Sequence, residues 1–395
     1  MRLTDQSINR RRRGKAPERM DLNVSTEQQP PMSRALELAA QGRGSVSPNP
    51  MVGAVIVAPG GRVIGEGFHA ELGGRHAEVA AIEDVRSRGA DPAGATIFVT
   101  LEPCAHHGRQ PPCTDAILAA GLTRVVIASD DPSAKASGRG PGMLRDGGLE
   151  VDWSEGAEAA AARLLNQPFR KHARTGRPLV ILKSAMSLDG RTATAEGDSK
   201  WISGEASRQL VHRWRAEADA VAVGIGTALA DDALLTAREV GARRQPRRVV
   251  FDSGARLPLG SKLATTTAES AVILIAGPNA DPDRVAALTA AGVEVVVCPG
   301  DGADRINPAL AELGRRGITS ILLEGGPTLA GAFTDAGELD ELRLFYAPIV
   351  FGGTDARPLL GGGGAPRIDD ADRALDVAWE PIGDDMLARV RLREW

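Results

Sequence analysis

Short apolar runs alternate with amphipathic stretches along the first half of the chain. Runs rich in Val and Ile predict strands over residues 52–57, 62–68, 95–100 and 124–129. The first two runs flank a Pro-Gly-Gly turn, which predicts a β-hairpin. Apolar residues at helical spacing predict helices over 33–40, 76–88, 113–120 and 155–166, the first with Ser33 as its N-cap. This order predicts a mixed α/β domain.

The second half repeats the alternation on its own. Strand-like runs occur at 179–183, 220–223, 248–251, 271–275, 293–297, 318–323 and 342–346, with helical stretches between them. Such alternation predicts a second α/β domain. A chain of 395 residues is long for a single core. We therefore expect one domain over 32–174 and another over 175–395, joined by a linker near 174–178.

Residues 1–31 differ from both domains. Four arginines stand at 10–13, and a breaker-rich segment follows at 28–31. No apolar segment comes after the charges, as a secretory signal would require. We expect a disordered, solvated extension; the alternative is an arm that touches nucleic acid.

The composition narrows the functional classes. A net charge of −4 and an aromatic content of 3% argue against a nucleic-acid binder, which usually carries a basic surface and stacking aromatics. Three cysteines do not form a disulfide framework, so a reducing cytoplasmic location is expected. No apolar run reaches the length of a membrane span, so no membrane partner is expected.

The strongest chemical signal is a His-Ala-Glu segment followed by two cysteines. His76, Cys104 and Cys113 offer an imidazole and two thiolates, the ligand set of a catalytic zinc that keeps a fourth position for water. Glu78 suits a group that moves protons to and from that water. Zinc deaminases of nucleobases show the same His-x-Glu and Pro-Cys order. His107 is a rival zinc ligand, and the two cysteines alone could be buried apolar residues.

Three further expectations follow from the sequence. Each zinc ligand is expected at or just before a helix start, where the positive end of the helix favours a thiolate. The Gly-rich segment at 137–142 is expected to be a loop, either a substrate lid or a plain connection. Cys298, in an apolar neighbourhood, is expected to be a buried thiol.

The second half carries weaker signals. Residues 324–331 follow a strand, contain three glycines and open a helix, an arrangement that suits a phosphate group. Residues 223–226 lack the full Gly-x-Gly-x-x-Gly spacing of an ordinary Rossmann domain. Arg215, Arg238 and the acidic pair at 231–232 could bind an anionic substrate or lie on solvated helix faces. Trp201 could simply be a packing residue.

Taken together, residues 32–395 resemble the bifunctional deaminase–reductases of riboflavin biosynthesis. The segments that carry this resemblance are 47–53, 65–69, 76–78, 100–107, 111–113, 187–191, 201, 227–232, 235–236 and 324–331. Eight residues separate Cys104 from Cys113, unlike the closer spacing of cytidine deaminases. The chain departs from the family pattern at 133–134 and at 233–234. The resemblance implies a cytidine-deaminase-like α/β/α domain followed by an α/β domain similar to dihydrofolate reductase.

The resemblance also implies two consecutive reactions on a small phosphorylated pyrimidine. Zn²⁺ on His76, Cys104 and Cys113, with Glu78 as proton carrier, would remove an amino group. NADPH would then reduce the ribosyl arm to ribityl. The pyrimidine would lie near Asn49 and His69. Substrate contacts implied in the second half are Ser199, Arg215, Leu235, Arg238 and Glu324. NADPH contacts implied are Ala185, Trp201, Thr227, Asp231, Ser253, Gly326, Pro327, Thr328, Leu329, Ala330 and Gly331.

Three questions stay open at this level. One half alone could be active. A zinc deaminase that edits nucleic acid through the basic arm is the competing class. The chain could also form a homo-oligomer.

Overall fold

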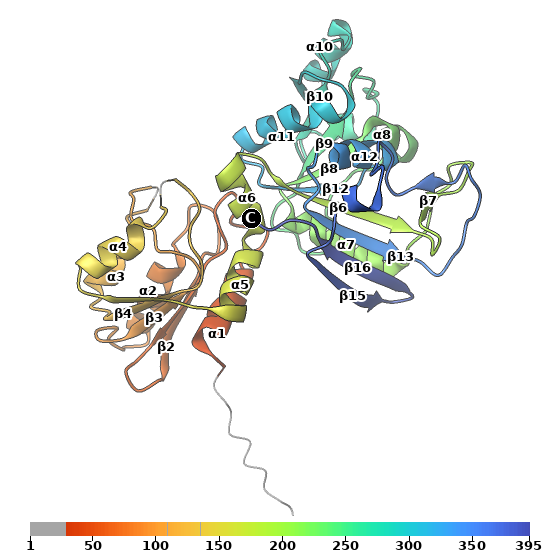
Figure 1. The fold of residues 1–395 in the computed structure, drawn as a ribbon. Coiled ribbons are helices and arrows are strands. Elements are labelled where there is room, and N and C mark those ends of the chain that lie inside the picture. Colours follow the sequence, from red (N-terminus) through yellow and green to blue (C-terminus); the bar gives the residue numbers. More distant parts are fainter. Residues whose placement is uncertain (1–28, 109, 135) are drawn as a thin grey trace, which may run out of the picture.

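The computed structural model describes residues 29–108, 110–134 and 136–395, which form two halves, each with its own central sheet (Figure 1). In the described residues, the N-terminal sheet has the order β2-β1-β3-β4-β5, and the larger C-terminal sheet has the order β11-β10-β9-β8-β12-β6-β13-β16-β15. The basic run at 10–13 lies outside these residues. No helix in the described part of the chain is long and apolar enough to cross a bilayer.

The N-terminal sheet combines a hairpin with a parallel portion. Its strands are β1 (Gly53–Val57), β2 (Val63–Phe68), β3 (Thr96–Val99), β4 (Arg124–Ile127) and β5 (Glu150–Trp153). The predicted hairpin is confirmed, because β1 pairs antiparallel with β2. Strand β1 also pairs antiparallel with β3, whereas β3, β4 and β5 run parallel.

Helices cover both faces of this sheet. They are α1 (Pro31–Ala40), α2 (Ala77–Ser87), α3 (Cys113–Ala119), α4 (Arg139–Asp146) and α5 (Gly156–Leu165). Buried apolar residues of α1 and α5 pack on one face, and those of α2, α3 and α4 pack on the other. Glycines on β2 let α2 lie close, since a Cβ at Gly67 would stand 2.3 Å from the Ala81 nitrogen. The result is an α/β/α sandwich.

The C-terminal sheet is parallel from β11 to β13 and ends in two antiparallel strands. Its strands are β6 (Leu179–Met186), β8 (Ala220–Gly224), β9 (Arg247–Phe251), β10 (Val272–Ala276), β11 (Glu294–Val297), β12 (Ser320–Leu323), β13 (Glu341–Tyr346), β15 (Asp376–Ile382) and β16 (Asp385–Arg391). Strand β16 runs antiparallel to β13 and to β15. A separate ribbon pairs β7 (Arg191–Ala193) with β14 (Arg357–Pro358).

Helices also pack on both faces of the larger sheet. They are α7 (Glu205–Glu217), α8 (Ile225–Asp231), α9 (Lys262–Thr265), α10 (Pro282–Ala290), α11 (Ile306–Arg315) and α12 (Pro327–Asp335). Apolar residues of α7 to α10 share one buried cluster, and those of α11 and α12 share another. Short 3₁₀ segments, η1 (Gly302–Arg305) and η2 (Ile368–Asp370), complete this half.

One helix between the halves was not predicted. Helix α6 (Gln167–Thr175) stands between the two sheets in Figure 1. Lys171, 1% exposed, lies 2.9 Å from the Glu338 carboxylate and 2.7 Å from the Asp340 carboxylate of the C-terminal half. The expected linker at 174–178 therefore begins inside a helix. The helix was missed because its buried face carries charged residues that form ion pairs, and not a stripe of apolar residues.

Two local predictions are wrong for physical reasons. Ser33 does not cap α1, because the helix begins two residues earlier at Pro31. The Ser33 hydroxyl donates instead to the Glu158 carboxylate at 3.0 Å. The Gly-rich segment at 137–142 is not simply a loop, because α4 begins at Arg139. A Cβ at Gly140 would stand 2.0 Å from the Pro103 carbonyl oxygen, so this glycine lets two segments touch.

Candidate active sites

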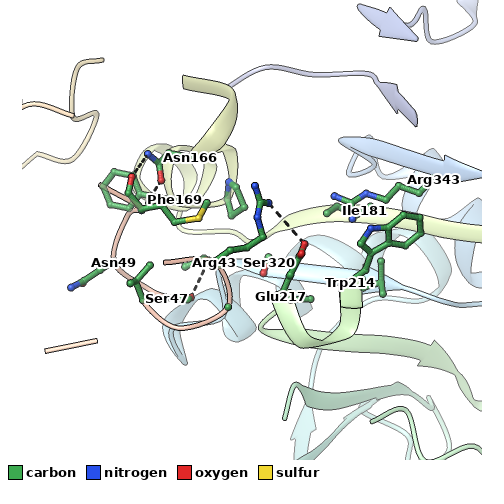
Figure 2. A pocket seen from close by; sticks show the side chains of 17 residues that line it. Arg43, Ser47, Asn49, Asn166, Phe169, Ile181, Trp214, Glu217, Ser320 and Arg343 are labelled. Carbon is green, nitrogen blue, oxygen red and sulfur yellow. Dashed lines mark hydrogen bonds and ion pairs between the residues drawn. The ribbon is translucent and has the colours of Figure 1, made fainter. Parts of the chain in front are cut away.

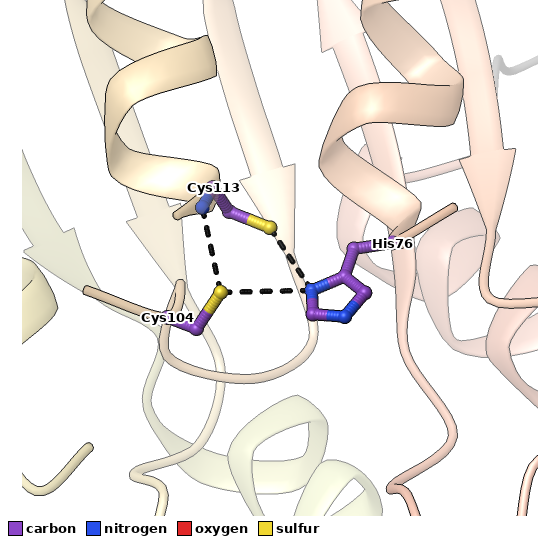
Figure 3. Close-up of side chains that lie close together, drawn as sticks. All are labelled: His76, Cys104 and Cys113. Atoms are coloured by element: carbon purple, nitrogen blue, oxygen red, sulfur yellow. Dashed lines mark hydrogen bonds between the residues drawn. The ribbon is translucent and has the colours of Figure 1, made fainter. Parts of the chain in front are cut away.

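Three side chains from separate segments of the N-terminal half converge at the ends of α2 and α3. The ligand atoms of His76, Cys104 and Cys113 all lie within 4.8 Å of one another. Figure 3 shows the His76 Nδ1 atom facing both sulfurs, 3.2 Å from Cys113 Sγ and 3.6 Å from Cys104 Sγ. One imidazole and two thiols at this separation match the donor set of a catalytic zinc site with one open position.

The helix starts place two of the three donors. His76 is the N-cap of α2, and Cys113 is the first residue of α3. Cys104 lies in the loop before α3, so the expectation of a helix start is wrong for this residue. Its sulfur nevertheless accepts a hydrogen bond from the Cys113 backbone N–H at 3.4 Å. The positive end of α3 therefore reaches both thiols.

The pKa values of the two thiols shift in opposite directions. A hydrogen bond from the Cys113 thiol, aided by His76, lowers the pKa of Cys104 to about 4. The same contact together with burial raises the pKa of Cys113. The contact with Cys104 raises the pKa of His76. A bound dication would favour both thiolates and the neutral imidazole, and its charge would balance that of the two thiolates.

Glu78 lies one helical residue inside α2 and is only 3% exposed. Burial, reinforced by the nearby Cys104, raises the pKa of Glu78 to about 7. A carboxyl group with this proton affinity can accept and return a proton near neutral pH. Its position beside the thiols suits a proton carrier, and Glu78 is not one of the three clustered metal donors.

Asn49 and His69 lie together beside the metal donors. Asn49 Nδ2 is 3.2 Å from His69 Nε2, and His69 Nδ1 is 2.9 Å from the Arg75 carbonyl oxygen. An amide donates to a ring nitrogen that has no proton, so Nδ1 carries the His69 proton. Burial lowers the pKa of His69, which keeps the ring neutral. The ring centroids of His69 and His76 are 5.4 Å apart.

Sequence reasoning missed Glu102, which supports the loop that carries Cys104. Its side chain is buried, and the Asp131 N–H donates to its carboxylate at 3.4 Å. The rival ligand His107 is exposed and does not join the metal cluster. A glutamate two residues before a predicted ligand was the available signal.

The C-terminal half contains a cavity of about 580 Å³ at the carboxyl ends of β8, β9 and β10. Ligands of α/β sheets commonly bind at this edge. Six residues implied as NADPH contacts line it: Thr227, Ser253, Gly326, Pro327, Thr328 and Leu329. Three arginines also line it: Arg256, Arg305 and Arg357. A basic cavity beside the N-terminus of α12 suits a phosphate-bearing nucleotide.

The other implied NADPH contacts lie elsewhere. Ala330 is fully buried in the core, and a Cβ at Gly331 would stand 2.4 Å from the Gly361 carbonyl oxygen. Trp201 is 74% exposed, with the Arg208 guanidinium 4.9 Å from its ring centroid. Asp231 pairs with Lys200 at 3.3 Å. Ala185 pairs with Phe345 across β6 and β13.

Two implied substrate contacts form a nearly buried ion pair. Arg215 donates to the Glu324 carboxylate through Nε at 2.7 Å and through a terminal nitrogen at 2.8 Å. Burial alone would raise the pKa of Glu324, but Arg215 holds it below its ordinary value. Arg215 also donates to the Thr236 carbonyl oxygen at 3.3 Å. Arg238 Nη1 donates to the Thr236 hydroxyl at 3.1 Å, which brings both arginines to one segment.

Lys183 was missed by sequence reasoning and belongs to the same group. It lies on β6, and desolvation lowers its pKa, while the neighbouring Glu324 acts in the opposite direction. A lone Lys within an apolar strand was the available signal. The remaining implied substrate contacts differ in exposure: Leu235 is 3% exposed within the core, whereas Ser199 is exposed.

Comparison with known proteins agrees with both halves. Residues 25–129 match the family described as the cytidine and deoxycytidylate deaminase zinc-binding region, and residues 178–388 match the RibD C-terminal domain. Two curated relatives are riboflavin biosynthesis proteins RibD. The one from Actinobacillus pleuropneumoniae is 40% identical over 357 residues, 90% of this chain and 93% of that protein. The one from Escherichia coli is 40% identical over 368 residues, 90% of this chain and 96% of that protein.

Solved structures agree in fold over nearly the whole chain. Acinetobacter baumannii RibD has a TM-score of 0.80 at 37% identity, covering 92% of this chain and 98% of that chain. A deaminase/reductase from Thermotoga maritima has a TM-score of 0.79 at 37% identity with the same coverage. Together with the clustered donors and the basic cavity, these matches show that the chain belongs to the RibD family, the zinc- and NADPH-dependent bifunctional deaminase–reductases of riboflavin biosynthesis.

Proposed function

We propose that the N-terminal half deaminates 2,5-diamino-6-(5-phosphoribosylamino)pyrimidin-4(3H)-one, and that the C-terminal half reduces the resulting 5-amino-6-(5-phosphoribosylamino)uracil to its ribityl form. The Thermotoga maritima relative carries the matching deaminase and reductase names. The observation that carries the first step is the cluster of His76, Cys104 and Cys113 within 4.8 Å. The proposed domains are 32–174 and 175–395.

In the deaminase half, His76, Cys104 and Cys113 would hold the zinc, which supplies an acidified water when bound. Glu78 would carry two protons in turn: one from the attacking water to the pyrimidine ring nitrogen, and one from the newly added hydroxyl to the amino group, which leaves as ammonia. Asn49 and His69 orient the pyrimidine. Because the His69 proton sits on Nδ1 and points to the Arg75 carbonyl, its Nε2 atom accepts from the Asn49 amide and holds that amide in place.

In the reductase half, NADPH supplies hydride when bound. Support for its placement comes from the cavity beside α12, where Thr227, Ser253 and residues 326–329 lie. The proposed cofactor contacts at Ala185, Trp201, Asp231, Ala330 and Gly331 remain predictions.

The substrate of the second step is proposed to lie against the buried ion pair. The reacting carbon is proposed to lie beside Glu324 and its neighbour Lys183, and Lys183 would deliver the proton that balances the hydride. Arg215 holds the Glu324 carboxylate in place through two hydrogen bonds. Arg238 is exposed, and its guanidinium donors other than the Nη1–H that contacts Thr236 would bind the 5′-phosphate. Ser199 and Leu235 complete the proposed contacts.

An assay of both products tests the proposed function. The diaminopyrimidine is offered with zinc and with NADPH or NADH in turn, and ammonia and nicotinamide absorbance are followed together. The proposal expects ammonia release with or without nicotinamide, and oxidation of NADPH that begins only after deamination. Ammonia release without any NADPH oxidation would leave a deaminase alone, and NADPH oxidation without ammonia release would contradict the proposed order of the two steps.

Two coarser features complete the proposal. We propose a cytoplasmic protein, because Cys104, Cys113 and Cys298 are all free thiols. We also propose a homo-oligomer, because the outer strand β15 presents an exposed Trp379 and Val377 at the sheet edge. Light scattering tests the second point: a monomer mass at micromolar concentration would contradict it.

A further inference from the structure

Two segments beside the deaminase site are held by residues outside the N-terminal sheet. The first is 47–51, which carries Asn49. The second is 129–131, which follows β4 and contacts Glu102. The contacts that fix them come from the C-terminal half and from α6, so the site's geometry depends on more than its own domain.

Segment 47–51 is fixed at its start by a buried carboxylate of the C-terminal half. The Ser47 hydroxyl donates to Asp219 Oδ2 at 2.7 Å. Asp219 is 4% exposed and pairs with Arg244. It also accepts the backbone N–H and the hydroxyl of Thr319, each at 2.7 Å. A carboxylate with this many partners has one orientation, so it gives Ser47 a fixed acceptor.

The same segment is fixed at its end by the residue before α6. Asn166 Oδ1 accepts the Met51 backbone N–H at 2.8 Å, and Asn166 Nδ2 donates to the Met51 carbonyl oxygen at 2.9 Å. Asn49, between these two anchors, contacts His69 at 3.2 Å. Only Pro48 separates Asn49 from Ser47, and only Pro50 separates it from Met51. A shift at Ser47 therefore moves the Asn49 amide.

Packing around segment 47–51 is incomplete on the side that faces the C-terminal half. A cavity of about 100 Å³ lies between segment 47–51 and the C-terminal sheet (Figure 2). Figure 2 shows Asn49 and Asn166 on one side of this cavity and Ile181 and Trp214 on the other. Packing contributes less to the position of the segment on the side where this cavity lies, so the polar anchors help to set that position.

Segment 129–131 is fixed by Arg170 of α6. The Arg170 side chain is 2% exposed and donates to the Ser129 hydroxyl at 3.1 Å and to the Asp130 carbonyl oxygen at 2.8 Å. Its Nε donates to the Trp395 carbonyl oxygen at 2.6 Å. Arg170 therefore ties this segment to Trp395, which follows β16 in the C-terminal half.

The second anchor also reaches the metal loop. The Ser129 carbonyl oxygen accepts the Glu102 N–H at 2.9 Å, and the Asp131 N–H donates to the Glu102 carboxylate. Glu102 stands two residues before Cys104. Arg170 thus acts on Cys104 through Ser129 and Glu102.

We propose that Asp219, through Ser47, and Arg170, through Ser129, are positioning residues of the deaminase site, so that the reductase half and α6 complete the geometry of deamination. This inference rests on the proposed deaminase function. Neither residue touches the substrate. Their effect is on where Asn49 and the Cys104 loop stand.

The first test replaces Ser47 in the full-length, zinc-loaded protein. Ser47→Ala removes the anchor, and we expect KM for the diaminopyrimidine to rise roughly tenfold, with a smaller change in kcat, because a misplaced contact weakens orientation. Ser47→Thr keeps the hydroxyl and should restore most of the affinity. Ser45→Ala is the matched control, since Ser45 also contacts the C-terminal half, through Arg243 at 3.3 Å, but lies farther from Asn49.

The second test replaces Arg170. Arg170→Met should lower deaminase kcat/KM roughly tenfold or more while zinc content and the reductase kinetics stay unchanged. Arg174→Met is its control, because Arg174 lies on the same helix and reaches the Asp130 carboxylate only at 4.0 Å. If Arg170→Met does not fold, Ser129→Ala removes one of the same hydrogen bonds with a smaller side-chain change.

Hydrogen exchange separates positioning from general damage. Ser47→Ala should speed amide exchange in segment 47–51 and leave the C-terminal sheet unchanged. Wild-type kinetics and exchange in both Ser47→Ala and Arg170→Met would overturn the inference, as would an equal loss in the reductase half. A wild-type protein that releases no ammonia would instead contradict the proposed function.

Discussion

The metal cluster of the N-terminal half is defined by the types of three side chains, whereas the cofactor cavity of the C-terminal half is defined by the shape of several segments. In the first, three donor side chains lie within 4.8 Å, and their residue types alone predict zinc. In the second, a cavity of about 580 Å³ is lined by short segments from several elements, with glycines and backbone prominent. A metal needs particular side chains, whereas a nucleotide is bound largely by backbone shape and dispersed charge. The first kind of site is therefore readable from sequence, and the second needs a fold.

The largest effect that separates the two sites is expected from Glu78→Gln. The amide keeps the size of the carboxyl but cannot carry a proton, so deamination should fall about 10²–10⁴-fold. Zinc content and the reductase step should not change, because Glu78 is not among the clustered donors. Ammonia release and metal analysis check this. A variant with normal deamination would remove Glu78 from the mechanism.

The corresponding change in the second site is Lys183→Met. If Lys183 supplies the proton beside Glu324, reduction of the uracil intermediate should fall roughly 10²-fold or more, with deamination unchanged. Absorbance of NADPH measures the loss. NADPH affinity, measured by fluorescence titration, should remain normal, and a loss of affinity alone would place Lys183 in the cofactor site instead.

A third change tests the ion pair next to Lys183. Arg215→Met leaves Glu324 nearly buried without its partner, which typically costs about 3–5 kcal/mol of folding free energy. Chemical denaturation should show this loss in the C-terminal half. Arg238→Met, on the exposed neighbour, should change stability by less than about 1 kcal/mol yet weaken binding of the phosphorylated substrate. Equal stability losses would show that the buried pair is not special.

The smallest expected effect concerns the contact between α4 and the metal loop. Gly140→Ala places a methyl group against the Pro103 carbonyl oxygen, which should cost about 1–3 kcal/mol through overpacking and slow deamination severalfold. Gly142→Ala on the same helix has open space around it and serves as the control. Matching thermal melts for the two variants would contradict the tight contact.

Much of the fold could be predicted because the periodicity was clear. The hairpin of β1 and β2 and the parallel strands β6, β8, β9, β10, β11 and β12 have apolar runs bounded by turns. Helix α6 could not be predicted in this way, because its inward face carries the charged residues Arg170 and Lys171. The partners of Lys171 lie more than 150 residues away in the sequence. Strands β15 and β16 also escaped notice, since their exposed edge mixes charged residues with Trp379.

The same physical limit applies to the sites. His76, Cys104 and Cys113 were identified by residue type, and the structure brings them together. Lys183 and Glu102 were missed, because a single charged residue acquires meaning only from the burial and neighbours that the fold gives it. Arg215 and Glu324 lie 109 positions apart, so no local pattern could pair them.

The separate chemistry of the two sites is tested most directly by removing zinc from the full-length protein. The chelated enzyme is offered the diaminopyrimidine, and separately the deaminated uracil with NADPH. The account predicts that ammonia release stops and returns when zinc is restored, while NADPH oxidation on the uracil continues throughout. Ammonia release that survives complete removal of the metal, or the joint loss of both reactions, would contradict it.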